Sequence, residues 1–233
     1  MKLRWRRSQN RGLVGRLLRA ATRLALCGIA AAVLLVAVLR FVDPPITYLM
    51  AREWLRLGAI EREWVGLRDM ADYLPLSAVA AEDANFCRHR GFDLAGIRDA
   101  MVDDRVRGGS SISQQVAKNV FLWPGRSWLR KGLEAGFTLL IEAIWGKRRI
   151  LEVYLNVAEM GEGVFGAEAA ARHFWRTGAA DLGPQRAARL MAVLPDPQGR
   201  SPVSGSAFIA RRGSAIQKGA ATIREDGRGA CFL

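Results

Sequence analysis

Cysteine and histidine are scarce in this chain of 233 residues, which contains three cysteines and two histidines. Cys27, Cys87 and Cys231 are too few and too scattered for the disulfide framework of a small secreted domain. No zinc-ligand spacing can be written with these cysteines and two histidines. The composition therefore excludes a disulfide scaffold and a structural metal site.

Acidic residues are absent from the first 23 residues, which carry eight lysines or arginines. An uncharged run follows, Leu24–Leu39, and it extends to Val42 if Arg40 turns its guanidinium back to the lipid headgroups. A helix over 24–42 would be about 28 Å long, close to the roughly 30 Å hydrocarbon core of a bilayer. We expect a basic cytoplasmic head (1–23), a transmembrane helix (24–42) and a domain across the membrane (43–233).

Two other interpretations of this segment remain open. The basic head could bind nucleic acid while the apolar run is buried in a core, or the segment could be a cleaved signal peptide. A cleavage site of small residues should then follow the apolar run, but the sequence there is RFVDPP (40–45). We therefore favour an uncleaved anchor in the inner membrane, and expect no nucleic acid partner.

Alternation with period two, typical of strands, is missing beyond residue 43, whereas apolar residues recur three and four apart in several stretches. These stretches are 76–81, 112–121, 128–145, 147–160, 167–175 and 185–194. Glycine and proline separate them. The pattern predicts one mainly α-helical domain. Ile209, Ile216 and Ile223 could line a last helix, which we expect to dock loosely on the surface.

Nucleotide-binding loops are also missing. The chain has no G-x-x-x-x-G-K-[ST] sequence, and GEGVFG (161–166) follows a helical pattern rather than the strand that a dinucleotide site requires. We interpret GEGVFG as a glycine turn joining two helices. Outside the cytoplasm no ATP is available, so a synthetic reaction there must take its energy from the substrate.

Two adjacent carboxylates, Glu82 and Asp83, end the first helical stretch of the domain. A solvated acidic helix end is the ordinary interpretation. The alternative is a general base, because the helix dipole, the neighbouring carboxylate and partial burial all raise the pKa of such a group.

A second polar stretch, GGSSISQQVAKN (108–119), begins the next helix. Ser111 and Gln114 form a capping box, yet a glycine-led helix N-terminus near Lys118 also suits an anionic phosphate. Arg130, Lys131 and Glu134 follow on another helix, either as a surface ion-pair set or as an active-site acid with cations that face a phosphate.

Five motifs in this order resemble those of the bacterial peptidoglycan glycosyltransferases. They are EDANFCRHRG (82–91), GGSSISQQVAKN (108–119), RKGLEAGFTLLIE (130–142), KRRILEVYLN (147–156) and RAARLMAVLPDP (186–197). The stretches 121–142 and 154–170 are similar to the monofunctional biosynthetic peptidoglycan transglycosylases in particular. The resemblance covers about residues 76–197, and the tail 199–233 matches weakly.

The resemblance implies an all-α, lysozyme-like fold in two lobes and an enzyme that polymerises lipid II. The growing MurNAc-linked chain on undecaprenyl pyrophosphate would be transferred to the GlcNAc 4-hydroxyl of lipid II with inversion, in the periplasm. Partners would be the membrane, the lipid-linked glycan and proteins of cell division or wall synthesis.

By resemblance, Glu82 is the catalytic base and Glu134 a second catalytic glutamate. Glu134 could orient the cations, help the leaving group, or hold a divalent cation such as Mg²⁺ or Mn²⁺; no other cofactor is expected. The implied substrate-binding residues are Asp83, Phe86, His89, Ser110, Gln114, Gln115, Lys118, Asn119, Arg126, Arg130 and Lys131.

Two features depart from the family or stay open. Cys87 is unusual in the first motif, and since nothing in the sequence places the tail near it, we favour free thiols at Cys87 and Cys231 over a disulfide between them. The apolar residues at 121–124 and 128–129 belong either to the core or to a surface that dips into lipid headgroups.

Other functions stay as alternatives to synthesis. A lysozyme-like muramidase or lytic transglycosylase would need a protonated carboxyl near the leaving oxygen, and would give the lysines and arginines no role. A membrane-tethered scaffold without catalysis would leave Glu82 incidental.

Overall fold

The computed structural model describes residues 3–93, 110–125 and 127–233. It comprises two units, residues 1–42 and 43–233. The first unit is helix α1 (Leu3–Leu39), in which Gly15–Leu39 is long and apolar enough to cross a membrane, a criterion that a signal sequence also meets. The helix ends at Leu39, before the predicted bound at Val42, and the Phe41 amide then makes a tighter turn to the Val38 carbonyl.

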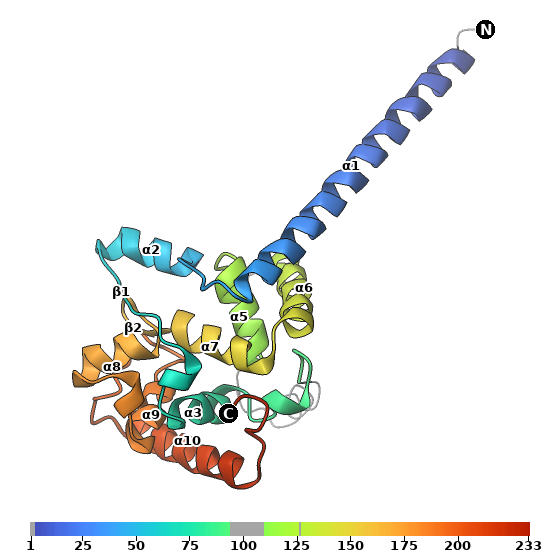
Figure 1. Cartoon of the computed structure of the whole chain (residues 1–233). Coiled ribbons are helices and arrows are strands. Elements are labelled where there is room, and N and C mark those ends of the chain that lie inside the picture. Colours follow the sequence, from blue (N-terminus) through green and yellow to red (C-terminus); the bar gives the residue numbers. More distant parts are fainter. Residues whose placement is uncertain (1–2, 94–109, 126) are drawn as a thin grey trace. The chain divides into compact units, whose positions relative to one another are not determined.

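The second unit is mainly helical, so the predicted all-α class is confirmed (Figure 1). Its helices are α2 (Tyr48–Leu57), α3 (Tyr73–Glu82), α5 (Ile112–Phe121), α6 (Trp128–Ile144), α7 (Lys147–Val157), α8 (Ala167–Trp175), α9 (Pro184–Ala192) and α10 (Ala207–Glu225). Short 3-10 turns are η1 (Leu67–Asp69), η2 (Phe86–Arg88) and η3 (Ala179–Asp181).

Capping residues and a proline in the sequence explain where two of these helices begin. Helix α5 begins at Ile112 with the predicted capping box, in which the Ser111 hydroxyl accepts from the Gln114 amide and the Gln114 side chain accepts from the Ser111 amide. Helix α3 begins earlier than its apolar pattern, at Tyr73, with Pro75 in its first turn. Proline is tolerated there because the first amides of a helix have no intrahelical acceptor.

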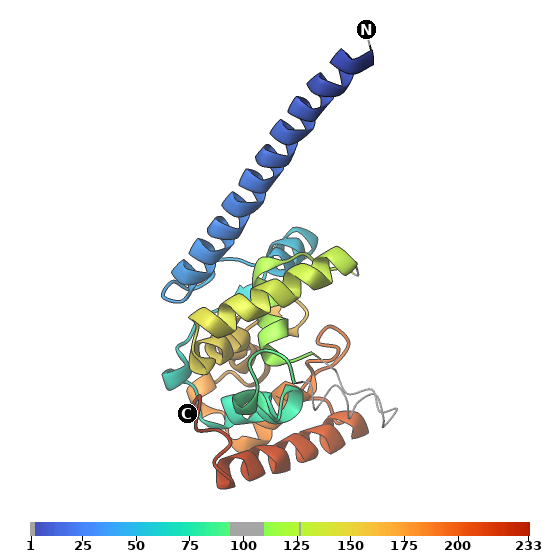
Figure 2. The same ribbon diagram turned by 90° about the vertical axis from the view of Figure 1, so that its right-hand side faces the viewer.

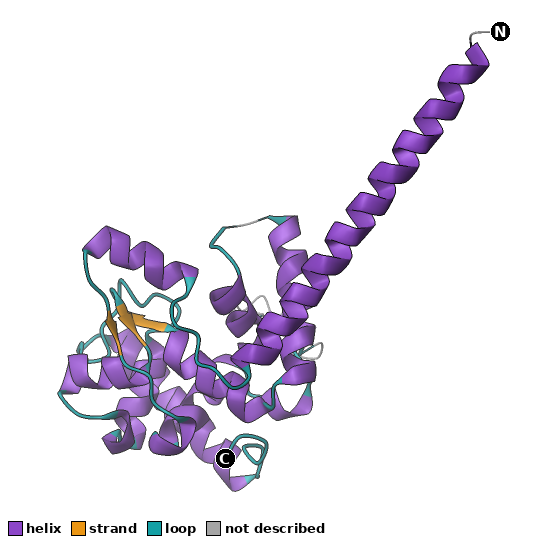
Figure 3. Ribbon diagram, turned by 45° about the horizontal axis from the view of Figure 1, so that its top comes forward, coloured by secondary structure: helices purple, strands orange, loops and turns teal. Residues whose placement is uncertain are grey.

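The GEGVFG sequence is a β-hairpin, so its interpretation as a simple turn between helices was wrong. Strands β2 (Glu159–Gly161) and β3 (Val164–Phe165) pair antiparallel, and β1 (Glu61–Arg62) pairs parallel with β3 (Figure 3). Such short strands cannot show an alternating pattern. Gly163 (φ 70°) forms the turn, and at Gly166 (φ 87°) a Cβ would lie 2.9 Å from the Asn156 carbonyl oxygen.

Helix α7 lies at the centre of the core. Its Ile150, Leu151, Val153 and Leu155 are fully buried. Helices α3, α9 and α10 pack together on one side, α5 and α6 pack together on another, and α7 contacts both groups. This grouping agrees with the two lobes implied by the resemblance. It also brings the end of α3 to the start of α5.

The last helix is packed firmly, contrary to the expectation of loose docking. Ile209, Ile216 and Ile223 are at most 5% exposed, because α10 lies along both α3 and α9 (Figure 2). The close approach depends on small residues, since a Cβ on Gly219 would lie 3.3 Å from the Ala80 Cβ. Its isoleucines, spaced every seven residues, share one helix face.

The chain after α10 returns to the first motif and is held there by a disulfide. Cys87 and Cys231 are bonded, with their Cα atoms 5.7 Å apart. The expectation of two free thiols was therefore wrong, because α10 carries the tail across the domain to residue 87. The neighbouring Phe232 is buried, with its ring 6.3 Å from that of Phe86.

Replacement of Cys231 by Ser should lower the stability of the domain. A disulfide that closes a loop of this length (sequence separation 144) usually contributes about 2 kcal/mol or more, roughly 4–8 °C in Tm for a domain of this size. Thermal unfolding of detergent-solubilised protein with and without reductant measures this. Reductant should bring the wild type to the level of Cys231→Ser, whereas Cys27→Ser should match the wild type; an unchanged wild-type Tm in reductant would contradict the pairing.

Candidate active site

Glu82 is the last residue of α3, and its side chain is only 15% exposed. Both carboxylate oxygens have partners. The Gln115 amide donates to Oε2 at 3.0 Å, and Arg212 Nη2 lies 3.4 Å from Oε1. Glu82 therefore lies where α3, α5 and α10 meet, and it is not a solvated helix end.

The pKa of Glu82 is raised above the ordinary value of a glutamate. Burial is the main cause, and the Asp83 carboxylate adds to it. The Gln115 hydrogen bond and the charges of Arg212 and Lys118 oppose the shift without cancelling it. A carboxyl of this kind is suited to accept a proton near neutral pH.

Tyr154 was not expected at this site, although it belongs to one of the quoted motifs. Its side chain is fully buried on α7, and its hydroxyl lies 3.5 Å from Gln115 Oε1, which is long for a hydrogen bond. Gln115 thus has Glu82 on one side and Tyr154 on the other. Its amide is oriented toward the base.

Asp83, His89 and Phe86 support Glu82 from within the domain. One Asp83 oxygen contacts His89 Nε2 at 2.8 Å, and the other accepts from the Ile112 amide at 3.0 Å. Phe86 is fully buried, with the Lys147 ammonium 4.4 Å from its ring centroid. We predicted these three as substrate-binding residues; the structure brings them beside Glu82 in supporting positions.

The polar side chains at the start of α5 mainly stabilise this end of the helix. Gln114 is buried and its side chain completes the capping box, while the Ser111 hydroxyl contacts the Gly91 carbonyl. Ser110 and Asn119 are half-buried. Of the polar residues predicted here, Gln115 is the one that reaches Glu82.

A second buried carboxylate, Glu134 on α6, is surrounded by cations. Its side chain is 3% exposed; Arg130 Nη1 donates to Oε2 at 2.9 Å, and Lys131 Nζ contacts Oε1. A pair this buried is not an ordinary surface ion pair. Arg126, predicted as part of this group, lies outside the described residues.

Lys118 is one turn beyond Gln115 on α5 and within electrostatic reach of both glutamates. Desolvation lowers its pKa; the Arg130 and Lys131 charges act in the same direction, and the Glu134 and Glu82 carboxylates oppose them. The Lys118 side chain is exposed to solvent. The charge of Lys118 therefore acts on both carboxylates, Glu82 and Glu134.

The residues around Glu134 do not fit a resident divalent cation. Both of its oxygens already accept from Arg130 and Lys131, and a metal ion would lie against these positive charges. Among the described residues no group of three or more His, Cys, Asp or Glu could hold a metal ion. Glu134 is instead paired with Arg130 and Lys131.

The apolar residues near the start of α6 divide between core and surface. Leu122 is buried, whereas Trp123 is 43% and Trp128 93% exposed. Leu129 is exposed beside Trp128. An apolar surface next to the basic cluster suits contact with lipid.

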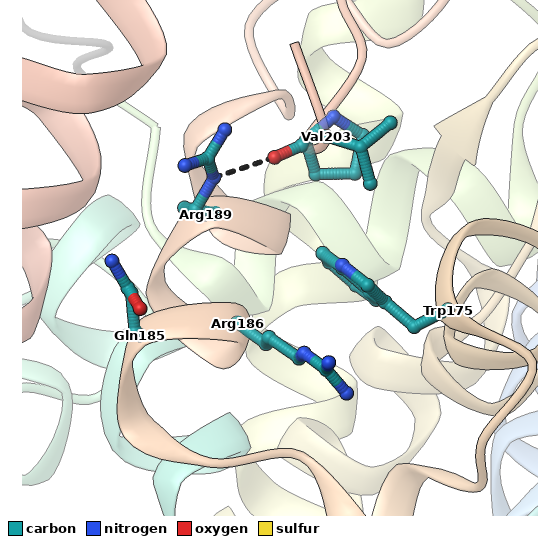
Figure 4. A pocket seen from close by; sticks show the side chains of 6 residues that line it. Trp175, Gln185, Arg186, Arg189 and Val203 are labelled. Carbon is teal, nitrogen blue, oxygen red and sulfur yellow. Dashed lines mark hydrogen bonds between the residues drawn. The ribbon is translucent and has the colours of Figure 1, made fainter. Parts of the chain in front are cut away.

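An open pocket of about 220 Å³ lies apart from these residues, among α8, α9 and the segment that follows (Figure 4). Arg189 donates to the carbonyls of Pro202 and Ser204, and so fixes that segment. The Arg186 guanidinium lies 5.9 Å from the Trp175 ring centroid. None of the predicted site residues lines this pocket.

Comparison with known proteins identifies the family of the chain. A family model described as Transglycosylase matches residues 51–221, a wider range than the motifs alone, which includes most of α10. A biosynthetic peptidoglycan transglycosylase of Jannaschia sp. is 56% identical over 191 residues, 82% of this chain and 80% of that protein.

Two further relatives carry the same name. The protein of Rhodospirillum centenum is 49% identical over 228 residues, 95% of this chain and 98% of its own length. That of Xanthomonas axonopodis pv. citri is 52% identical over 200 residues, 81% of each chain. The chain therefore belongs to the transglycosylase family, and within it to the biosynthetic peptidoglycan transglycosylases.

Proposed function

We propose that this enzyme polymerises lipid II into glycan strands at the outer face of the inner membrane. One arrangement carries the proposal: the largely buried Glu82 and the buried Glu134, which holds Arg130 and Lys131, both lie within electrostatic reach of Lys118. A base for the acceptor and a cationic site for the leaving group are the two parts that the transfer requires.

In the proposed step Glu82 takes the proton of the GlcNAc 4-hydroxyl of lipid II. The acceptor oxygen forms a bond to the anomeric carbon of the donor MurNAc, while the bond from that carbon to the pyrophosphate oxygen breaks. Undecaprenyl pyrophosphate leaves with the electron pair, and attack from the opposite side inverts the configuration. The sugar–pyrophosphate bond supplies the free energy, so no ATP is needed.

The cations stabilise the leaving group. A pyrophosphate leaves without a proton donor but accumulates negative charge in the transition state, where prearranged positive groups are most effective. Lys118, Arg130 and Lys131 supply that charge, and Arg126 is assigned with them by resemblance. Glu134 orders Arg130 and Lys131 and limits their mutual repulsion.

Two parts of the chain support the proposed contact with the membrane. Helix α1 supplies a candidate span, with its basic head on the cytoplasmic side. The exposed Trp128 and Leu129 would meet the headgroups and the polyprenyl chain of the substrate. Lipid II and its polymer are the proposed partners, together with proteins of wall synthesis or division.

Synthesis accounts for more of the site than cleavage does. A muramidase needs a protonated carboxyl at the glycosidic oxygen, and the cations near Lys118 would have no task there. Incubation of the detergent-purified protein with labelled lipid II distinguishes the functions. Polymer that a muramidase degrades supports synthesis, fragments of preformed glycan support cleavage, and unchanged substrates support a scaffold.

Glu82→Gln should reduce polymerisation by at least about two orders of magnitude, the scale of a positioned base. The fold should survive. Because the pKa of Glu82 is raised above 4.5, its stabilising effect is present below about pH 4.5 and is lost as pH rises through the raised pKa, so loss of the charge should not lower the Tm at pH 7. Glu162→Gln, which removes an exposed carboxylate paired with Arg56, is the matched control. Activity within a few-fold of wild type would remove Glu82 from the mechanism.

Lys118→Ala should lower kcat/KM for lipid II by about 100-fold, the usual effect of removing one transition-state donor. It should also weaken inhibition by added undecaprenyl pyrophosphate. Lys118→Arg keeps the charge and should retain most of the activity. If undecaprenyl pyrophosphate inhibits Lys118→Ala as strongly as wild type, the pyrophosphate assignment is wrong.

A reporter enzyme that needs disulfides should be active when fused after Asp43 and inactive when fused within residues 1–23, since disulfides persist in the periplasm and not in the cytoplasm. Cell fractionation should find the fusion with the inner membrane. The opposite activity pattern would reverse the proposed orientation.

A further inference from the structure

We propose that Arg212 is a positioning residue for Glu82, which holds one carboxylate oxygen from the C-terminal helix and supplies the counter-charge of the base. This inference rests on the proposed role of Glu82. None of the five motifs named in the sequence analysis includes Arg212, and 130 residues separate Arg212 from Glu82. The two side chains meet only because α10 packs along α3.

The two oxygens of the Glu82 carboxylate are contacted by side chains from two different helices. Arg212 Nη2 lies 3.4 Å from Oε1, and Gln115 on α5 donates to Oε2 at 3.0 Å. One neutral and one charged donor thus fix the plane of the carboxylate. Arg212 is one-third exposed, so its contact is looser than that of Gln115 and mainly electrostatic.

Arg212 lies on α10, a helix that is firmly packed against the rest of the domain. Ile209 and Ile216 are buried on either side of it in sequence, and at the adjacent Gly213 a Cβ would lie 3.2 Å from Arg189 Cγ. Beyond the helix, Arg228 Nη1 donates to the Ala84 carbonyl at 3.3 Å. The Cys87–Cys231 bond then ties the tail to the segment that follows Glu82.

Several groups that face Glu82 affect its pKa, and Arg212 is one of two cations among them. Lys118 and Gln115 face it from α5, Tyr154 from α7, Arg212 from α10, and Asp83 from its own segment. Burial and Asp83 raise the pKa of Glu82, while Gln115, Arg212 and Lys118 lower it, Arg212 more than Lys118.

The two cations should not act alike once the donor is bound. The Lys118 ammonium would be shared with the pyrophosphate, so its effect on Glu82 is offset by the negative charge of the substrate. Arg212 belongs to a different helix and keeps Glu82 as its partner. Arg212 is then the counter-charge that keeps the base ionised until it accepts the proton of the acceptor hydroxyl.

The test is the pH dependence of lipid II polymerisation by the full-length protein in detergent, from about pH 5 to pH 9. An opposite charge at this distance commonly lowers the pKa of a carboxyl by one unit or more. Arg212→Gln should therefore lose roughly tenfold in kcat/KM at the acid end and less than about threefold at the alkaline end. Arg212→Lys should restore most of the acid-end activity.

Arg224→Gln is the matched control, because Arg224 lies on the same helix and makes a similar ion pair, 3.5 Å from Asp72. It should follow the wild-type profile at every pH. A loss of activity by Arg212→Gln that is equal at all pH values would overturn the positioning role. A rise in KM for lipid II, with the pH dependence at the acid end unchanged, would also overturn it and would make Arg212 a substrate contact. Full activity of Glu82→Gln would instead refute the proposed function.

Discussion

The Asp83 carboxylate joins the two groups of helices on which the site is built. It follows α3 directly, and its oxygens are taken by His89 and by the amide of Ile112, the first residue of α5. An anion that accepts from a helix N-terminus is stabilised by the free amides and by the dipole. Because the end of α3 and the start of α5 are fixed to each other, Glu82 faces Gln115 and Lys118 one to two turns along α5. A substitution at Asp83 would free both helix ends at once.

Glu82 and Glu134 have different surroundings, and the proposed function gives them different roles. Glu82 has one amide and one partly exposed guanidinium as partners, and burial dominates its pKa. Glu134 has a direct cation at each oxygen, so its carboxylate is committed to holding those cations. The contrast follows a general rule for acid–base sites, in which environments rather than residue types separate the roles of like groups. It supports Glu82 as the base and Glu134 as the organiser of the leaving-group site.

The C-terminal region packs against the candidate active site. Helix α10 covers α3, places a guanidinium at Glu82 and leads to a tail that is bonded to the first motif. Burial of the Glu82 carboxylate raises its pKa, while the charge of Arg212 on α10 acts in the opposite direction. The packing of α10 also resists fraying of the last turn of α3. The motifs alone suggested a weak resemblance after residue 199, but the family match extends through most of α10.

The sequence by itself determined most of the helices, though not α2, together with the candidate anchor, the family and the positions of Glu82, Lys118 and Glu134, because caps, apolar periodicity and ordered motifs act between neighbours in the chain. The Ser111 capping box and the bounds of α5 and α8 are of this kind. Only the tertiary structure decided the three-stranded sheet, the burial of Phe86, the Cys87–Cys231 bond and the contact of Arg212 with Glu82. Each of these joins residues far apart in sequence, and a contact that depends on how whole helices pack leaves no periodic signal at either end.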